Sequence, residues 1–177
     1  MQDNMAMSDQ VIKRVGKNIA ELPVTLKGWF ELLHIRDGIV IDKRIIPNTV
    51  CYAGFTEVAG LFNTDQAGSY TAFDYIAIGP GTTAADPGDT TLVAEIVAGG
   101  GERRGGADVA GTLVTTTNTN DTSQWVTTYS FTASFAVTES GVLNAAAAGT
   151  LLCRQTFSPI NVASGDSLQV TWKVQCS

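Results

Sequence analysis

The chain has 177 residues, of which 44% are hydrophobic and only 16% are charged, and its formal net charge at pH 7 is −6. This length suits one domain, and the acidic balance argues against a nucleic-acid groove, since such grooves concentrate Lys and Arg. The basic residues are unevenly placed: seven of the eleven fall within the first 44 residues. The N-terminal quarter therefore differs chemically from the rest of the chain.

Residues 1–23 are expected to form an extended arm in front of a single β domain, 24–177. Within the arm, Ser8 suits the N-cap of a short helix and Pro23 would end it. The apolar stripe of this helix would consist of Val11, Ile12, Val15 and Ile19. Three basic residues lie off the stripe and are candidate partner-binding residues: Lys13, Arg14 and Lys17.

Polar residues follow Met1 directly, and no apolar run reaches the ~18 residues that a membrane span needs. The sequence therefore predicts no signal peptide, no membrane contact, and folding in a cytoplasm.

The first part of the β domain is predicted to be a hairpin. Thr25–Ile35 and Ile39–Ile46 flank Asp37-Gly38, a dipeptide that favours a type I′ turn. After it the apolar spacing changes, which indicates a short helix within Val50–Phe62.

Later segments continue the strand pattern. Strands are expected at Phe73–Ile78, Ala110–Thr117, Gln124–Thr138, Leu151–Phe157 and Ser167–Ser177, with turns at Ser140-Gly141 and Gly165-Asp166. Leu92–Val97 fits a short helix or a strand. The tract Gly99–Gly106 is expected to be a mobile loop or one that a partner orders, and its Arg103 and Arg104 are further candidate partner-binding residues.

The closing strand carries the clearest pattern. From Leu168 to the C-terminus, apolar and polar residues alternate strictly, as in a strand with one buried and one wet face. About seven such strands and one or two short helices predict a mainly β fold: an antiparallel β-sandwich or a jelly-roll-like barrel, whose last strand ties the C-terminus into the sheet.

The three cysteines, Cys51, Cys153 and Cys176, show no CxxC spacing and are expected to be buried, reduced thiols. His34, the single histidine, lies between apolar neighbours, which favours a structural or surface role over a catalytic one. Gly79–Thr83 follows a strand but lacks the Lys of a phosphate loop.

Four loop acids could offer oxygen ligands to Ca²⁺, but their spacing matches no calcium-loop pattern: Asp86, Asp89, Asp108 and Asp121. The sequence thus predicts neither an enzyme nor a metal or other cofactor.

A carbohydrate-binding module is a distant alternative, because exposed aromatic rings could form a platform on which sugars stack. Trp125 and Trp172 lie on the apolar sides of their strands, which favours the core. Tyr70, in a polar stretch, is the best exposed candidate and is counted among the partner-binding residues.

Several short runs resemble one group of proteins in combination. They are Asn48-Thr49-Val50, Ala53-Gly54-Phe55, Val58–Leu61, Phe73–Ala84, Thr90-Thr91-Leu92 with Glu95, Phe131–Phe135, Glu139–Ala145, Leu152–Phe157 and Gly165–Trp172. Over about Asn48–Ser177 the chain resembles small virion structural proteins of tailed bacteriophages. Residues 1–47 match less well, and Gly99–Gly106 looks particular to this chain.

The resemblance implies a non-enzymatic β-rich protein of the virion. The expected role is capsid decoration (cement), in which a homotrimer or other ring binds the major capsid protein and stabilises the head shell. The alternative is a tail-tip, fibre or adaptor subunit that contacts neighbouring tail proteins.

Overall fold

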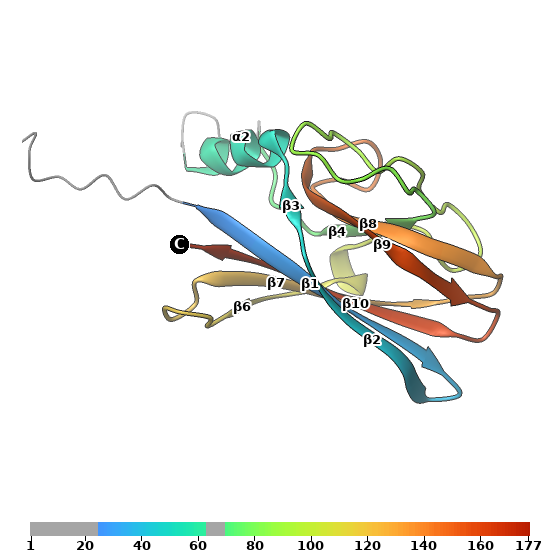
Figure 1. Ribbon diagram of the computed structural model, residues 1–177. Helices are drawn as coiled ribbons and strands as arrows, with labels where there is room; N and C mark the ends of the chain where they lie inside the picture. The colour runs from blue at the N-terminus through green and yellow to red at the C-terminus, as the bar shows by residue number, and fades with distance from the viewer. Residues whose placement is uncertain (1–24, 63–69) are drawn as a thin grey trace, which may run out of the picture.

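The computed structural model describes residues 25–62 and 70–177. These residues form a mainly β protein with two five-stranded antiparallel sheets and one α-helix (Figure 1), which confirms the predicted fold class. The sheets pack face to face as a β-sandwich around one main core cluster. The expected arm, with Lys13, Arg14 and Lys17, lies outside the described residues.

The first sheet, called sheet A, has the strand order β2-β1-β10-β7-β6. Its strands are β2 (Ile39–Pro47), β1 (Leu26–Arg36), β10 (Ser167–Cys176), β7 (Thr122–Ser130) and β6 (Ala110–Val114). Sheet B has the order β3-β9-β8-β4-β5. Its strands are β3 (Thr49–Val50), β9 (Leu151–Val162), β8 (Phe135–Leu143), β4 (Tyr75–Gly79) and β5 (Arg104–Gly105). Helix α2 (Tyr52–Leu61) and the short 3₁₀ helix η2 (Gly106–Asp108) complete the described elements.

The first hairpin forms as predicted. Arg36 lies opposite Ile39, so Asp37 and Gly38 make a two-residue turn between β1 and β2. Both turn residues have positive φ, 51° and 76°, as a type I′ turn requires. The predicted short helix is also confirmed as α2.

The closing strand β10 lies in the middle of sheet A, between β1 and β7. Its alternation buries Leu168, Val170, Trp172 and Val174. The Thr25 N–H donates to the carbonyl of Ser177 (2.7 Å), and the Ser177 N–H donates to that of Thr25 (2.9 Å). The predicted tie between the C-terminus and the sheet is confirmed, and it places the start of β1 beside the end of β10 (Figure 1).

The predicted single strand over Gln124–Thr138 is wrong. The structure divides this stretch into β7 in sheet A and β8 in sheet B, joined by Phe131–Ser134. Both strands face the shared core, so the alternation runs through the junction and cannot reveal the change of sheet.

The predicted turn at Ser140-Gly141 lies instead inside β8. There the Ser140 hydroxyl donates to the carbonyl of Ala77 (2.9 Å). A Cβ on Gly141 would lie 2.8 Å from the Leu92 side chain, so the glycine permits close packing rather than a turn.

The stretch from Pro80 to Arg103, called the β4–β5 loop, is drawn in green above β8 and β9 in Figure 1. It contains Leu92–Val97, which is neither helix nor strand, contrary to the prediction. Leu92 and Ile96 of this stretch are nevertheless buried, so burial of single side chains rather than regular structure holds the loop.

Candidate interaction surfaces

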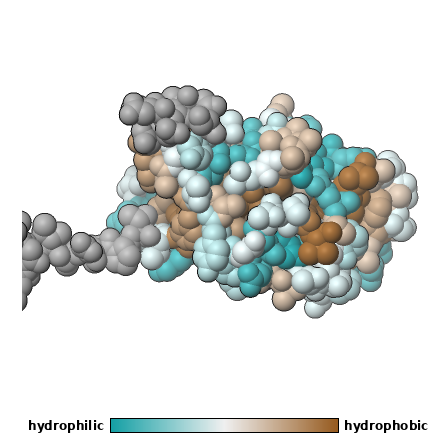
Figure 2. Space-filling model, turned by 90° about the horizontal axis from the view of Figure 1, so that it is seen from above, coloured by the Kyte–Doolittle hydropathy of each residue, from teal (hydrophilic) through white to brown (hydrophobic). Residues whose placement is uncertain are grey.

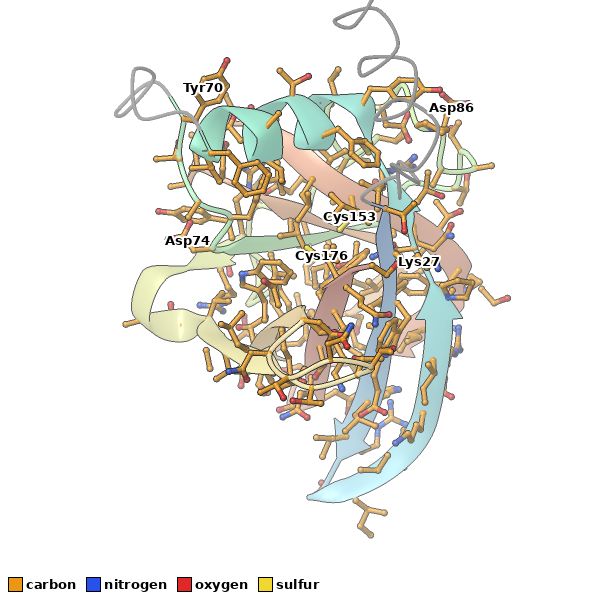
Figure 3. All side chains as sticks on the ribbon, turned by 90° about the vertical axis from the view of Figure 1, so that its left-hand side faces the viewer. Lys27, Tyr70, Asp74, Asp86, Cys153 and Cys176 are labelled. Atoms are coloured by element: carbon orange, nitrogen blue, oxygen red, sulfur yellow. The ribbon has the colours of Figure 1, made fainter. Side chains whose placement is uncertain are left out.

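An apolar groove of about 470 Å³ opens at the end of the sandwich where the C-terminus lies. Helix α2, the start of β1, the end of β10 and parts of β6 and β7 surround it. Its principal lining residues are Leu26, Val58, Leu61, Phe62, Leu113, Trp125, Val174 and Cys176. Figure 3 faces this end of the molecule, with Cys176 below α2 and Tyr70 near one end of the helix.

The groove exists because α2 is held close to sheet B while β6 and β7 belong to sheet A. A Cβ on Gly54 of α2 would lie only 2.7 Å from the Cα atom of Leu152, so the glycine lets the helix approach β9 closely. Phe62, the residue that follows α2, remains 81% exposed. Two layers that close around the core thus leave an opening between them at this end.

The chemistry of the groove is that of an apolar binding surface. The indole N–H of Trp125 donates to the Phe73 carbonyl (2.6 Å), which fixes the ring and satisfies its polar atom. Among the described residues that line the groove, none is charged. The groove therefore suits apolar side chains of another protein segment. Figure 2 shows further apolar residues gathered in separate patches on the upper face of the molecule.

Cys176 corrects the expectation of three buried thiols. Cys51 and Cys153 are buried, and burial raises the pKa of the Cys51 thiol to about 11 and also raises that of Cys153. Cys176, the last residue of β10, is exposed in the groove, and all three cysteines are free thiols. The alternation correctly predicted that Cys176 lies on the core-facing side of β10. At this end of the strand, however, that side lines the open groove instead of the packed core.

The tract Gly99–Gly106 is held by the chain itself, which corrects the expectation of a mobile or partner-ordered loop. Arg104–Gly105 forms β5 and pairs with Tyr75–Ile76 of β4. The Arg103 guanidinium pairs with Glu95 (2.6 Å) and donates to the carbonyls of Ala145 and Ala148, each at 2.8 Å.

Among the predicted partner-binding residues, Arg103 thus connects the β4–β5 loop to the loop that follows β8, and its side chain is only 9% exposed. Arg104 donates to the Gly100 carbonyl (3.2 Å) and lies over the Tyr129 ring, 5.7 Å from its centroid. Tyr70 is half-buried, and its ring lies where a side chain on Gly60 of α2 would be. Partner contacts by these residues stay a prediction, and the structure does not gather them into one site.

A buried charge cluster lies in sheet B beneath the β4–β5 loop. The Nε of Arg154 on β9 donates to Glu139 of β8 (2.7 Å), and both side chains are fully buried. Arg154 also pairs with Asp89 (2.6 Å) and donates to the Thr83 carbonyl (2.7 Å). Burial alone would lower the pKa of Arg154, but its hydrogen bonds and opposite charges outweigh that and raise it.

Glu139 completes the cluster by accepting the N–H groups of Val93 (3.1 Å) and Ala94 (2.7 Å). Every partner of the two charges is therefore a strand residue or part of the β4–β5 loop. The cluster fastens this long irregular segment to the sheet, and sequence reasoning missed it. The one available signal was a lone Arg after the apolar run Leu151–Cys153.

A second charged cluster joins the end of β1 to the residue that precedes β10. His34 Nε2 lies 2.8 Å from a carboxylate oxygen of Asp166, and Arg36 makes two hydrogen bonds to the same carboxylate, at 2.7 and 2.8 Å. The Arg36 hydrogen bonds lower the pKa of Asp166 far below its usual range, helped by the Ala163 N–H and by His34. The His34 side chain is thus buried in an ion-pair network, in agreement with a structural role.

Three of the four loop acids accept backbone N–H groups of their own loops, and the fourth, Asp108, lies 4.0 Å from Arg104. Asp121 accepts the N–H groups of Thr116, Thr117 and Asn118, each at 2.9 Å, and these bonds lower the pKa of its carboxyl group. Asp86 accepts the Gly88 N–H (2.7 Å). In the described part of the chain, no three His, Cys, Asp or Glu side chains are grouped closely enough to hold a metal ion.

Comparisons with known proteins found no matching family model, no matching curated protein and no matching solved structure. Within residues 25–62 and 70–177, no helix has the length and apolar character needed to cross a membrane.

Proposed function

We propose that this protein is a non-enzymatic structural protein of a tailed-bacteriophage virion, and specifically a decoration or cement protein that binds the head shell. The apolar groove carries the proposal. A groove that is lined by Leu, Phe, Val and Trp side chains and lacks charged lining residues among those described is suited to receive apolar side chains of another protein.

The buried charged residues support the same proposal, because they bind within the protein itself. The buried Glu57, Glu139, Arg154 and Asp166 all bind other parts of the same chain and hold loops on the sandwich. The buried charges thus hold the loops in place, and the protein is a rigid body. A rigid body that presents apolar surfaces loses little conformational entropy when it binds, which favours a subunit that must add to a preformed shell.

In this proposal the groove contacts the shell protein, and residues 1–23, with Lys13, Arg14 and Lys17, reach across to neighbouring subunits. The protein assembles with other virion parts in the host cytoplasm. The resemblance over Asn48–Ser177 favours the virion setting, and the uncharged groove favours protein contact over nucleic-acid contact.

Quantitative mass spectrometry of purified particles tests the location. Decoration requires hundreds of copies per particle, on the scale of the shell protein. A few dozen copies or fewer would instead support the alternative role as a tail-tip, fibre or adaptor subunit. Absence from purified particles would overturn both.

A substitution in the groove tests the surface itself. Leu113→Asp places a charge on an exposed lining residue and should abolish shell occupancy while the body remains folded, as judged by circular dichroism. Thr128→Asp, which adds the same charge at an exposed position on the outer face of β7, should leave occupancy unchanged. Full occupancy by the Leu113→Asp protein would overturn the assignment of the groove.

A further inference from the structure

Strand β2 forms one edge of sheet A, and it is unusually apolar for an edge. It pairs with β1 on one side, and on the other side it has no neighbouring strand among the described residues. Its exposed apolar side chains have exposed fractions between 50% and 66%: Ile39, Val40, Ile41 and Ile45. Edge strands present unpaired N–H and C=O groups that can pair with another chain, and these four side chains add exposed apolar area on either side of the central charged residues of β2.

The free backbone groups of β2 can be identified from its pairing with β1. The Asn48 N–H donates to the Gly28 carbonyl (3.0 Å), so Asn48 and Gly28 form a hydrogen-bonded pair. Hydrogen-bonded and non-bonded pairs alternate along an antiparallel ladder. The backbone groups of Arg44 and Asp42 therefore face β1, while those of Ile45 and Lys43 face outward, and Ile41 is the extra residue at the bulge, without a partner on β1.

The sequence of β2 is self-complementary about Lys43, the middle residue of the strand. In an antiparallel pair centred there, Lys43 lies opposite Lys43 of a second copy, and exposed Ile41 lies opposite exposed Ile45. Pro47 occupies an outward-facing position and has no N–H, so the ladder ends there. Centring the pair on Ile41 or Ile45 would shorten the overlap, because it would extend into the turn or place Pro47 opposite Lys43.

The repulsion between the two opposed Lys43 side chains is offset within each chain. Each Lys43 carries its own counter-ion, since its Nζ lies 2.8 Å from Glu31 on β1. Arg44 and Asp42 pair with each other at 2.6 Å, and Arg44 also donates to the carbonyls of Ser158 and Pro159 on β9, so their charges are satisfied within the chain. Apart from these paired charges, the outer edge of β2 presents isoleucine and valine side chains and the outward-facing peptide groups.

We propose that β2 pairs with β2 of a second copy of this chain across a two-fold axis at Lys43, which joins the two copies of sheet A into one continuous antiparallel sheet. The interface is isologous: Ile41 of each copy contacts Ile45 of the other. This dimer is an assembly of the protein in solution and does not depend on the proposed virion role.

Sedimentation equilibrium of the purified chain tests the dimer, and Ile45→Lys is the informative variant. The substitution changes an exposed side chain, so the fold should be kept, but it places a second cation at the proposed interface. We expect the wild type to be a dimer and the variant to dissociate with at least a tenfold higher Kd, about 1.4 kcal/mol. Val97→Lys, at a side chain that is 78% exposed in the β4–β5 loop, should remain dimeric.

Disulfide trapping tests the register in a Cys176→Ser background, which removes the exposed native thiol. Mild oxidation should link an Ile41→Cys protein to an Ile45→Cys protein in a mixture far more than it links either protein to itself. A monomeric or trimeric wild type, a dimer that withstands Ile45→Lys, or equal self-linking of the two cysteine proteins would overturn the proposal.

Discussion

Arg154 and Glu139 form an ion pair at 2.7 Å in which neither side chain is exposed to solvent. The pair joins β9 to β8, and its remaining hydrogen bonds reach Thr83, Asp89, Val93 and Ala94 of the β4–β5 loop. An irregular segment of this length would otherwise have few backbone partners. The pair therefore explains how the loop can cover sheet B without regular structure of its own.

Removal of the Arg154 charge should destabilise the protein strongly. Arg154→Met leaves Glu139 buried without its counter-ion, and loss of one partner of a buried pair costs roughly 3–5 kcal/mol. Urea unfolding measures the change in free energy. Lys27→Met, which removes a positive charge from an exposed position, should change the stability by less than about 0.5 kcal/mol. A loss of similar size in both variants would contradict a special role for the buried pair.

The Asp166 cluster predicts a defined dependence of stability on pH. The pKa of Asp166 is lowered in the folded protein, so its ionised form contributes stability that is fully present above its unfolded pKa of about 3.9 and is lost as pH falls through the native pKa. Asp166→Asn should therefore be less stable than wild type at pH 7. The difference in urea midpoint should narrow below about pH 4.

The matched control for this experiment is Asp74→Asn, at an exposed carboxylate labelled in Figure 3. It should track wild type throughout the titration. A difference in urea midpoint between wild type and Asp166→Asn that stays constant down to about pH 2 would contradict the stabilising role of the ionised Asp166 carboxylate.

Two glycines in strands should respond in opposite ways to alanine. A Cβ on Gly79 of β4 would overlap the carbonyl oxygen of Ala94, which is backbone and cannot swing aside. Gly79→Ala should cost at least about 1–3 kcal/mol. A Cβ on Gly111 of β6 would meet only Trp125, at 3.9 Å, so Gly111→Ala should be neutral or slightly stabilising. Thermal unfolding of both variants checks the difference, and equal shifts would be inconsistent with the packing described.

Thiol labelling should distinguish the three cysteines. A water-soluble disulfide reagent at pH 8 should modify one thiol rapidly in the folded protein, because Cys176 is exposed while Cys51 and Cys153 are buried and have raised pKa values. All three should react in denaturant. Cys176→Ser should abolish the fast phase, whereas a fast phase that survives in this variant would show that the interior opens readily.

Much of the fold followed from local patterns. The Asp37-Gly38 dipeptide determined the first turn, because few residue pairs accept positive φ at both positions. The strict alternation from Leu168 onward determined the closing strand and its buried face. The altered apolar spacing after Val50 determined the helix that became α2.

Other features depended on contacts between distant parts of the chain. Alternation shows that one face of a strand is buried but not which sheet the strand joins, so it could not divide β7 from β8. Gly141 had the sequence appearance of a turn, yet its lack of a side chain serves the packing of Leu92 against β8.

The candidate sites follow the same division. The sequence by itself determined that the protein is a charge-poor β body with an N-terminal segment of different chemistry, because composition and period-two spacing are properties of neighbouring residues. Only the tertiary structure decided that Cys176 lies in an apolar groove, that Arg103 holds two loops together, and that β2 is an edge strand of sheet A among the described residues. The physical reason is that a groove, a buried pair and a sheet edge are made by segments far apart in the chain, and their existence depends on which segments pack together.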